Sequence, residues 1–278
     1  MKSEALSPDV MIYCANCVNV KLEGDFVDLT VTSPPYDDLR EYNGYVFDFE
    51  AIADELYRIT KPGGVVVWVV GDATVDGSET GTSFRQALYF MDIGFRLHDT
   101  MIYTKNGPSY PSKNKYYQVF EYMFVLSKGE PKTINLIKDR KNRWYGEKWS
   151  KVRTRRDKAG NLTRQDWYVD EGDKYGVRFN VWKINGGHGW SAEEGYAFDH
   201  PAIFPEALAR DHILSWSNPG DVVYDPMMGS GTTGKMAVKY DRKFIGAEIS
   251  DEYYQIARRR IKETLMQPKL FTEKETNT

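Results

Sequence analysis

Two short segments of the 278-residue chain carry residue types that could do chemistry. The first is Thr32-Ser33-Pro34-Pro35-Tyr36 and the second is Asp225-Pro226-Met227-Met228-Gly229-Ser230-Gly231-Thr232-Thr233, and each follows an apolar run. The first offers hydrogen-bond acceptors and an aromatic face, and the second offers a glycine turn that opens a helix. Together they indicate a flat heterocycle held beside a nucleotide-like cofactor.

The first segment presents acceptors rather than donors. Ser33 precedes a proline, which pushes it towards extended backbone, and Pro34 and Pro35 have fixed φ and no N–H. The turn therefore offers carbonyl oxygens and a hydroxyl to a substrate that donates hydrogen bonds, such as an exocyclic amino group. Tyr36 could stack on the ring that carries this group. A rigid Pro-Pro turn without a ligand is the alternative for this segment alone.

The second segment predicts a cofactor loop. Gly229 and Gly231 permit positive φ and close approach of a ligand, and Thr232 or Thr233 could cap a helix whose N-terminus favours a carboxylate or phosphate. Glu248 ends the next apolar run, where an acid could accept both hydroxyls of a ribose. This pattern fits a nicotinamide enzyme or a methyltransferase, and a bare glycine turn is the structural alternative. No room follows the loop for a second mononucleotide-binding half, which disfavours the nicotinamide enzyme.

Charge is distributed unevenly along the chain. Residues 128–183 hold 16 Lys and Arg against 8 Asp and Glu, whereas the remainder holds 21 against 32. A basic segment within an acidic chain suggests a polyanionic partner, although a solvated charged insertion would have the same composition.

Apolar patterning predicts alternating strands and helices and therefore a mostly parallel α/β sheet. The expected strands are 10–13, 26–32, 65–70, 96–103, 221–224 and 244–249, and the expected helices are 49–59, 83–91, 204–216, 232–239 and 251–263. Residues 105–183 break the alternation and are predicted to be an insertion into one domain formed by 1–104 and 184–266. The polar tail, 267–278, is expected to be disordered.

The remaining composition points to a cytoplasmic protein without a metal site. No apolar run approaches the roughly 20 residues of a membrane-spanning helix, and the N-terminus lacks the features of a signal peptide. The two cysteines, Cys14 and Cys17, and the four histidines are not spaced as a ligand set.

Taken together, the two segments resemble motifs of the amino-methylating DNA methyltransferases that use S-adenosylmethionine. Thr32–Tyr36 is similar to their (S/D/N)PP(Y/F) catalytic loop, and Asp225–Thr233 is similar to their DPFxGSGTT cofactor loop, with Met227 in place of the usual Phe. The catalytic loop comes first, as in the circularly permuted β group of that family. The resemblance extends to Lys61–Gly64, His200–Pro205 and Ile245–Glu248.

The resemblance implies a Rossmann-like methyltransferase fold, with a mixed, mostly parallel sheet of seven strands and an inserted target-recognition region at 105–183. Glu248 would bind the ribose of the cofactor and the glycine loop its methionine end, while Ser33 and Pro34 would hold the amino group of a flipped base and Tyr36 would stack on it. The implied catalytic residues are Ser33, Pro34, Pro35 and Tyr36. The implied cofactor-binding residues are Asn16, His200, Phe204, Pro205, Asp225, Pro226, Met227, Gly229, Gly231, Thr232, Thr233 and Glu248. The implied DNA-binding residues are Lys151, Arg153, Arg155 and Arg156.

Ser-Pro-Pro-Tyr in this family leans towards cytosine N4 and Asp-Pro-Pro-Tyr towards adenine N6. We therefore expect site-specific methylation of cytosine N4 in double-stranded DNA, with adenine N6 as the alternative. The resemblance also suggests association with the nucleoid, a cognate restriction endonuclease and a homodimer. An RNA methyltransferase, a nicotinamide-dependent oxidoreductase and a catalytically idle nucleic-acid-binding protein are the other hypotheses.

Overall fold

The computed structural model describes residues 2–35, 47–107, 115–143, 145–146, 149–169, 172–187 and 189–267. These residues divide into two compact units. The larger consists of 2–135 together with 180–267, and the smaller consists of 136–179.

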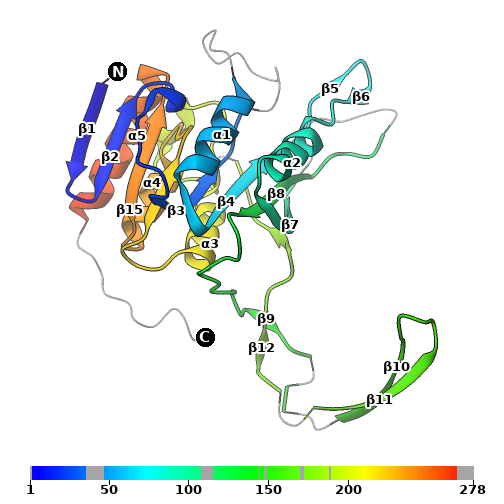
Figure 1. Cartoon of the computed structure of the whole chain (residues 1–278). Coiled ribbons are helices and arrows are strands. Elements are labelled where there is room, and N and C mark those ends of the chain that lie inside the picture. Colours follow the sequence, from blue (N-terminus) through cyan, green and yellow to red (C-terminus); the bar gives the residue numbers. More distant parts are fainter. Residues whose placement is uncertain are drawn as a thin grey trace. The chain divides into compact units, whose positions relative to one another are not determined.

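The larger unit is built on one sheet of nine described strands, in the order β1-β2-β15-β14-β3-β4-β8-β7-β13 (Figure 1). The neighbours β2-β15, β15-β14, β14-β3, β3-β4 and β7-β13 are parallel, and β1-β2, β4-β8 and β8-β7 are antiparallel. The strands are β1 (Lys2–Ser7), β2 (Val10–Cys14), β3 (Val27–Thr32), β4 (Thr60–Val70), β7 (Arg96–Thr104), β8 (Phe120–Ser127), β13 (Val181–Lys183), β14 (Val222–Asp225) and β15 (Lys243–Glu248).

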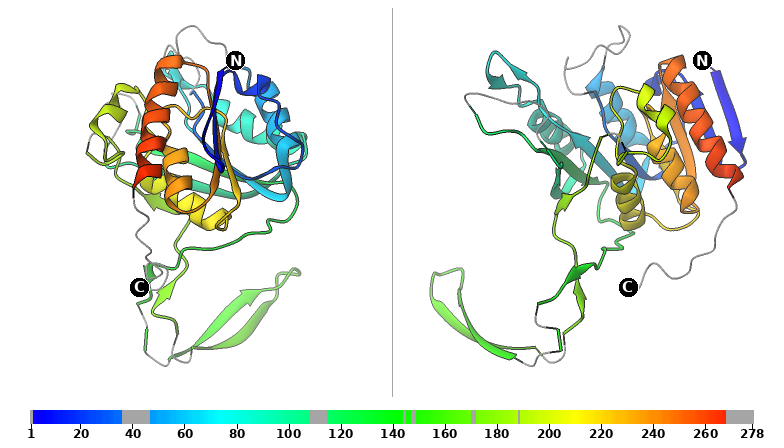
Figure 2. Two further views of the ribbon diagram at one scale, coloured as in Figure 1. Left: turned by 90° about the vertical axis from the view of Figure 1, so that its left-hand side faces the viewer. Right: turned by 180° about the vertical axis from the view of Figure 1, so that it is seen from behind.

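Helices cover both faces of this sheet (Figure 2). On one face, α3 (Glu206–Trp216), α4 (Thr232–Lys239) and α5 (Asp251–Met266) pack on the side chains of the central parallel strands. On the other face lie α1 (Phe49–Ile59) and α2 (Thr82–Asp92). The helix α1 begins where the Asp48 carboxylate accepts the N–H of Ala51 at 3.2 Å, and it buries Ile52, Ala53, Leu56 and Ile59 at helical spacing.

Short elements complete the described chain. In the larger unit these are the turns η1 (Cys17–Asn19) and η2 (Gly195–Asp199) and the strand pair β5 (Thr74–Val75) and β6 (Ser78–Glu79). The smaller unit contains the pair β9 (Arg140–Lys141) and β12 (Tyr175–Gly176) and the longer pair β10 (Trp149–Arg156) and β11 (Leu162–Val169). Among the helices of the described residues, none has the length and apolarity needed to cross a bilayer.

The structure corrects two sequence-based expectations about the sheet. It has nine described strands rather than seven, because β1 is largely exposed and β13 is short, so neither has a strong apolar pattern. The expected insertion at 105–183 is too long, because β8 pairs between β4 and β7 and β13 pairs with β7. The separate unit begins at 136 and ends at 179. Of the expected tail, 268–278 lie outside the described residues.

Candidate active site

Four neighbouring strands end at one edge of the sheet. Because β2, β15, β14 and β3 are parallel and adjacent, their carboxyl ends lie together. Asn16 follows β2, Glu248 ends β15, Asp225 ends β14, and Ser33 follows β3. Residues far apart in the sequence therefore meet at the edge where open α/β sheets bind their ligands.

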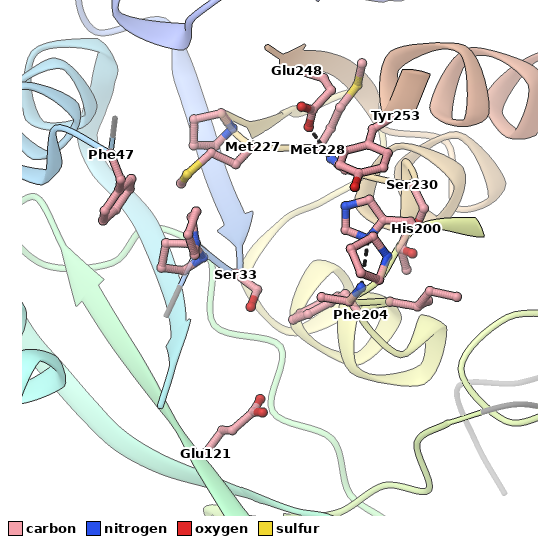
Figure 3. A pocket seen from close by; sticks show the side chains of 18 of the residues that line it. Ser33, Phe47, Glu121, His200, Phe204, Met227, Met228, Ser230, Glu248 and Tyr253 are labelled. Carbon is pink, nitrogen blue, oxygen red and sulfur yellow. Dashed lines mark hydrogen bonds between the residues drawn. The ribbon is translucent and has the colours of Figure 1, made fainter. Parts of the chain in front are cut away.

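A pocket of about 1430 Å³ lies at these strand ends (Figure 3). Most of the predicted site residues line it: Asn16, Ser33, Pro34, Pro35, His200, Phe204, Pro205, Pro226, Met227, Gly229, Thr232 and Glu248. Tyr36 lies outside the described residues. Asp225, Gly231 and Thr233 are buried and do not line the pocket.

Glu248 is held by backbone donors. One carboxylate oxygen accepts the N–H of Gly229 at 2.9 Å and the other accepts the N–H of Ser250 at 2.9 Å. Burial raises the pKa of this carboxyl, and the two N–H groups oppose the shift. Since each carboxylate oxygen has a second lone pair, Glu248 can still accept hydrogen bonds from a ligand in the pocket.

Asp225 links the two motifs from the protein interior, beneath the pocket lining. Its Oδ1 accepts the Thr32 hydroxyl at 2.8 Å and the N–H of Met227 at 3.1 Å. Burial raises the pKa of Asp225 to about 6, against the lowering effect of these hydrogen bonds. The carboxylate therefore fixes the end of β3 against the start of the glycine loop.

Gly231 and Thr233 also act from behind the pocket. Gly231 has φ +79°, and a Cβ there would lie 2.8 Å from the Cα of Ala257 in α5. This glycine thus allows α4 to begin close against α5. The Thr233 hydroxyl donates to the carbonyl of Val31 at 3.1 Å, which joins α4 to β3.

A second wall of the pocket comes from the segment before α3. The Nδ1 of His200 accepts the N–H of Ala202 at 3.1 Å, and the His200 ring meets Tyr253 edge to face at 4.4 Å. Gly229 has φ +48°, and a Cβ on it would lie 2.9 Å from the His200 Nε2. His200 and the glycine loop are therefore in close contact, and Phe204 lies beside them (Figure 3).

The other end of the pocket contains Ser33 and a charged pair. Figure 3 shows Glu121 at the far end from Glu248, with Ser33 between them. Glu121 lies on β8 and forms an ion pair with Lys105, which also lines the pocket. Phe47 and Tyr89 add aromatic surface to the lining. The pocket thus extends from the Glu248 carboxylate past Ser33 to the charged pair.

A buried ion network behind the glycine loop was not predicted from the sequence. Arg260 of α5 is fully buried and donates from Nη1 to the Ser230 carbonyl at 2.8 Å and to the hydroxyls of Ser230 and Thr232 at 3.1 Å each. Its other nitrogens reach Glu206 at 2.7 Å and Glu194 at 3.2 Å. One side chain therefore binds both the glycine loop and the segment that carries His200.

Lys235 of α4 completes this network. It is buried and lies 2.7 Å from Glu194, 2.8 Å from Glu206 and 3.2 Å from Glu193. Burial alone would raise the pKa of Glu194, but Lys235 and Arg260 hold it below its usual value. Glu194 is therefore charged, and the two cations compensate it in the interior.

The predicted DNA-binding residues lie in the smaller unit. Lys151, Arg155 and Arg156 are on β10 and are exposed, and Arg153 pairs with Gln165 of β11. The backbone pairing runs over eight positions, from Trp149 with Val169 to Arg156 with Leu162. These residues form a two-stranded ribbon (Figure 1).

Comparison with known proteins identifies the class of the fold and then the family. The solved structure titled PvuII DNA methyltransferase (cytosine-N4-specific) matches 96% of this chain and 89% of its own, with a TM-score of 0.67 at 20% identity. The fold is thus the α/β methyltransferase fold. A family model described as DNA methylase matches residues 27–259. The chain belongs to this N6/N4 family of S-adenosylmethionine-dependent DNA methyltransferases.

Two curated relatives cover most of the chain. The orphan methyltransferase M.BamHII of Bacillus amyloliquefaciens is 62% identical over 237 residues, which is 85% of this chain and 89% of that protein. The DNA adenine methyltransferase YhdJ of Escherichia coli (strain K12) is 27% identical over 259 residues, which is 87% of this chain and 78% of that protein.

The family, the α/β fold class and the cofactor predicted from the sequence are confirmed, and the nicotinamide hypothesis is wrong. A cognate restriction endonuclease, a homodimer and location at the nucleoid stay predictions.

Proposed function

We propose that this DNA methyltransferase transfers the methyl group of S-adenosylmethionine to N4 of a flipped cytosine at a specific site in double-stranded DNA. The observation that carries the proposal is the position of Ser33 and its two prolines. They line the same pocket as Glu248 and the glycine loop, with Glu248 at the opposite end from Glu121 of the charged pair (Figure 3).

The chemistry of the residues that line the pocket fits the cofactor. S-adenosylmethionine supplies an electrophilic methyl group on a sulfonium. Glu248 would accept the ribose hydroxyls through its remaining lone pairs, and Asn16 and Met227 would contact the adenine. The N-terminus of α4, with Gly229 and the Thr232 hydroxyl, would favour the carboxylate of the methionine end.

Three predicted cofactor ligands take a different role in this proposal. Asp225, Gly231 and Thr233 position the loop from the interior through Thr32, Ala257 and Val31 rather than by touching the cofactor. His200 and Phe204 would close the remaining side of the pocket. A Cβ on Gly229 would lie only 2.9 Å from the His200 Nε2, so a side chain at this position of the loop would displace that wall.

The Ser-Pro-Pro loop would orient the amino group of the base. A base within the duplex cannot reach the donor, so it must rotate into the pocket. The Ser33 hydroxyl and the Pro34 carbonyl would accept the two amino hydrogens, which aims the nitrogen lone pair at the methyl group. Ser33 is a poor base, so we assign it orientation rather than proton abstraction, and the proton that the amino nitrogen loses on methylation would pass to water. Tyr36 would stack on the base.

Ser33 favours cytosine over adenine in this proposal. A neutral hydroxyl heads the loop here, whereas the adenine-type loop of the family begins with a carboxylate. The names of the relatives support either base, since one matched protein is named cytosine-N4-specific and another is named an adenine methyltransferase. Adenine N6 is therefore the second candidate.

Transfer of labelled methyl groups to unmethylated genomic DNA, followed by nucleoside mass spectrometry, tests the proposal. N4-methylcytosine would support it, and Ser33→Ala should then lose most activity while binding the cofactor as the wild type does. N6-methyladenine would contradict the choice of base and leave the rest intact. Methylated RNA but not DNA, or no product from protein that binds the cofactor, would contradict the proposed DNA substrate.

A further inference from the structure

The two faces of the β10–β11 ribbon differ in chemistry. Side chains alternate between faces along a strand, and directly paired residues share a face. Positions 151, 153 and 155 alternate along β10 and therefore belong to one face. Arg153 pairs with Gln165, and Arg155 pairs with Thr163. Gln165 and Thr163 of β11 therefore share this face with Lys151 and Arg155. We call the four residues Lys151, Arg155, Thr163 and Gln165 the polar face.

The opposite face carries a mixture of apolar, acidic, basic and neutral polar residues. Val152 pairs with Asp166, Thr154 with Arg164, and Arg156 with Leu162. Val152 is 54% exposed and Leu162 is 65% exposed. We call these six residues the mixed face.

Charge and hydrogen-bonding capacity distinguish the two faces as nucleic-acid contacts. The polar face has two cations and no carboxylate among its described residues, and its side chains are exposed. The mixed face sets Asp166, which would repel a phosphate, beside exposed apolar surface. One arginine of the mixed face already has a hydrogen-bond partner within the ribbon, because Arg156 donates to the Gly160 carbonyl at 2.8 Å in the turn that joins the strands.

The turn makes the ribbon a defined unit. The Asp157 carboxylate accepts the N–H groups of Ala159 and Asn161 at 2.9 Å each, and the backbone closes between Asp157 and Asn161 at 3.0 Å. The Thr163 hydroxyl donates to the carbonyl of Arg155 at 2.9 Å. These contacts fix the register and hence which side chains share a face.

We infer that the β10–β11 ribbon reads the DNA major groove with its polar face, and that Arg156 and Arg164 do not contribute to this readout. The inference rests on the proposed function and deepens it. Two strands about 4.8 Å apart with side chains fit the major groove, which is about 12 Å wide, and not the minor groove of about 6 Å. Arg and Gln are the side chains that pair bidentately with guanine and adenine in that groove, and Lys suits phosphate. Arg155 and Gln165 therefore face base edges, and Lys151 faces the backbone.

Arg155 and Arg164 offer a matched test of this inference. Both are exposed arginines on the same ribbon, both lie opposite a threonine, and they occupy opposite faces. Arg155→Gln and Arg164→Gln remove the same charge, so they differ only in the face they alter. We expect Arg155→Gln to raise the dissociation constant for the DNA sequence that the enzyme methylates about tenfold or more. The variant should also discriminate less strongly at one guanine of that sequence. Arg164→Gln should stay within about twofold.

Substitution of 7-deazaguanine at each guanine of the site identifies the groove, because it removes the N7 acceptor from the major groove only. It should weaken the wild type at one position and have no further effect on Arg155→Gln. Equal losses in the two variants, no loss in either, a site without guanine, or no effect of 7-deazaguanine would overturn the inference. Unchanged cofactor affinity and melting temperature in both variants exclude misfolding.

Failure of the proposed function is distinguishable from these results. If the wild type neither binds nor methylates DNA, the DNA substrate itself is wrong. If the wild type methylates DNA and the two variants behave alike, only the assignment of the polar face is wrong.

Discussion

Replacement of Arg260 by methionine tests whether the buried network positions the cofactor loop. The Arg260 guanidinium joins Ser230 of that loop to Glu194 of the segment before α3 and to Glu206, the first residue of α3. Methionine keeps an unbranched apolar stem but donates nothing. The Ser230 carbonyl then loses this donor, and the two carboxylates keep Lys235 as a cationic partner.

The magnitude follows from the burial of these groups. Removal of one partner of a buried ion pair costs about 3–5 kcal/mol. Since Lys235 still compensates both carboxylates, we expect the lower end, about 3 kcal/mol, or a fall in melting temperature of about 6–12 °C. We also expect the dissociation constant of S-adenosylmethionine to rise about tenfold, which corresponds to about 1.4 kcal/mol of lost positioning.

Thermal unfolding and isothermal titration with the cofactor, below the melting temperature of the variant, measure both effects. Arg259→Met is the matched control, because Arg259 is the neighbour on α5 and its side chain is 60% exposed. It should change neither quantity appreciably. A lower melting temperature for Arg260→Met with wild-type cofactor affinity would refute the positioning role and leave only a structural one. Equal melting temperatures and equal cofactor affinities for the two variants would refute both the positioning role and the structural role of Arg260.

Two further predictions concern carboxylates of the site. The folded-state pKa of Asp225, about 6, lies above its unfolded value of about 3.9, so the stability linked to its protonated form is lost as pH rises through that interval. Between about pH 4 and pH 7, the free energy of unfolding of the wild type should therefore fall by about 3 kcal/mol relative to that of Asp225→Asn, with no further change at higher pH. A difference between the two proteins that stays constant with pH in urea unfolding would contradict this. Glu248→Gln leaves only one oxygen to accept from Gly229 and Ser250 and removes the charge that faces the ribose. It should raise the dissociation constant of S-adenosylmethionine about 10- to 100-fold, whereas the exposed Glu252→Gln should not, and equal affinities would contradict the ribose assignment.

The sequence predicted the central elements well because their signals are local. The helix expected at 49–59 is α1, and the one expected at 232–239 is α4. Continuous apolar runs such as Val65–Val70 are typical of strands buried on both faces, and this run lies within β4. The strand β8 was missed, although it contains the apolar run Tyr122–Leu126, because it follows a polar, aromatic stretch. Its antiparallel pairing with β4 and β7 is a tertiary contact that no local pattern encodes.

Most residues that line the pocket could be named from the sequence, but the buried residues that hold them in place could not. Motif residues such as Ser33 and Glu248 can be recognised in the sequence because they lie at the ends of predicted strands. Arg260 cannot be recognised in this way, because it is the last of three consecutive arginines and nothing in that run distinguishes it from the half-buried Arg258 and the exposed Arg259. Only the packing of α5 against the glycine loop at Gly231 and Ala257 decides it. Long charged side chains are mostly exposed, so sequence composition assigns Lys235 and Arg260 to the surface.

One hydrogen bond connects the two motifs that define this enzyme. The Thr32 hydroxyl donates to the Asp225 carboxylate at 2.8 Å, so the residue before Ser33 is tied to the residue that opens the cofactor loop. Methyl transfer requires the acceptor nitrogen and the donor methyl group to be aligned closely, and misplacement of about 1 Å is costly. The separation of the Ser-Pro-Pro loop from the glycine loop is thus set in the sheet, by two adjacent parallel strands and this buried contact, before any ligand binds. In the proposed function, Asp225 therefore holds the two loops in register from the interior, without touching either substrate.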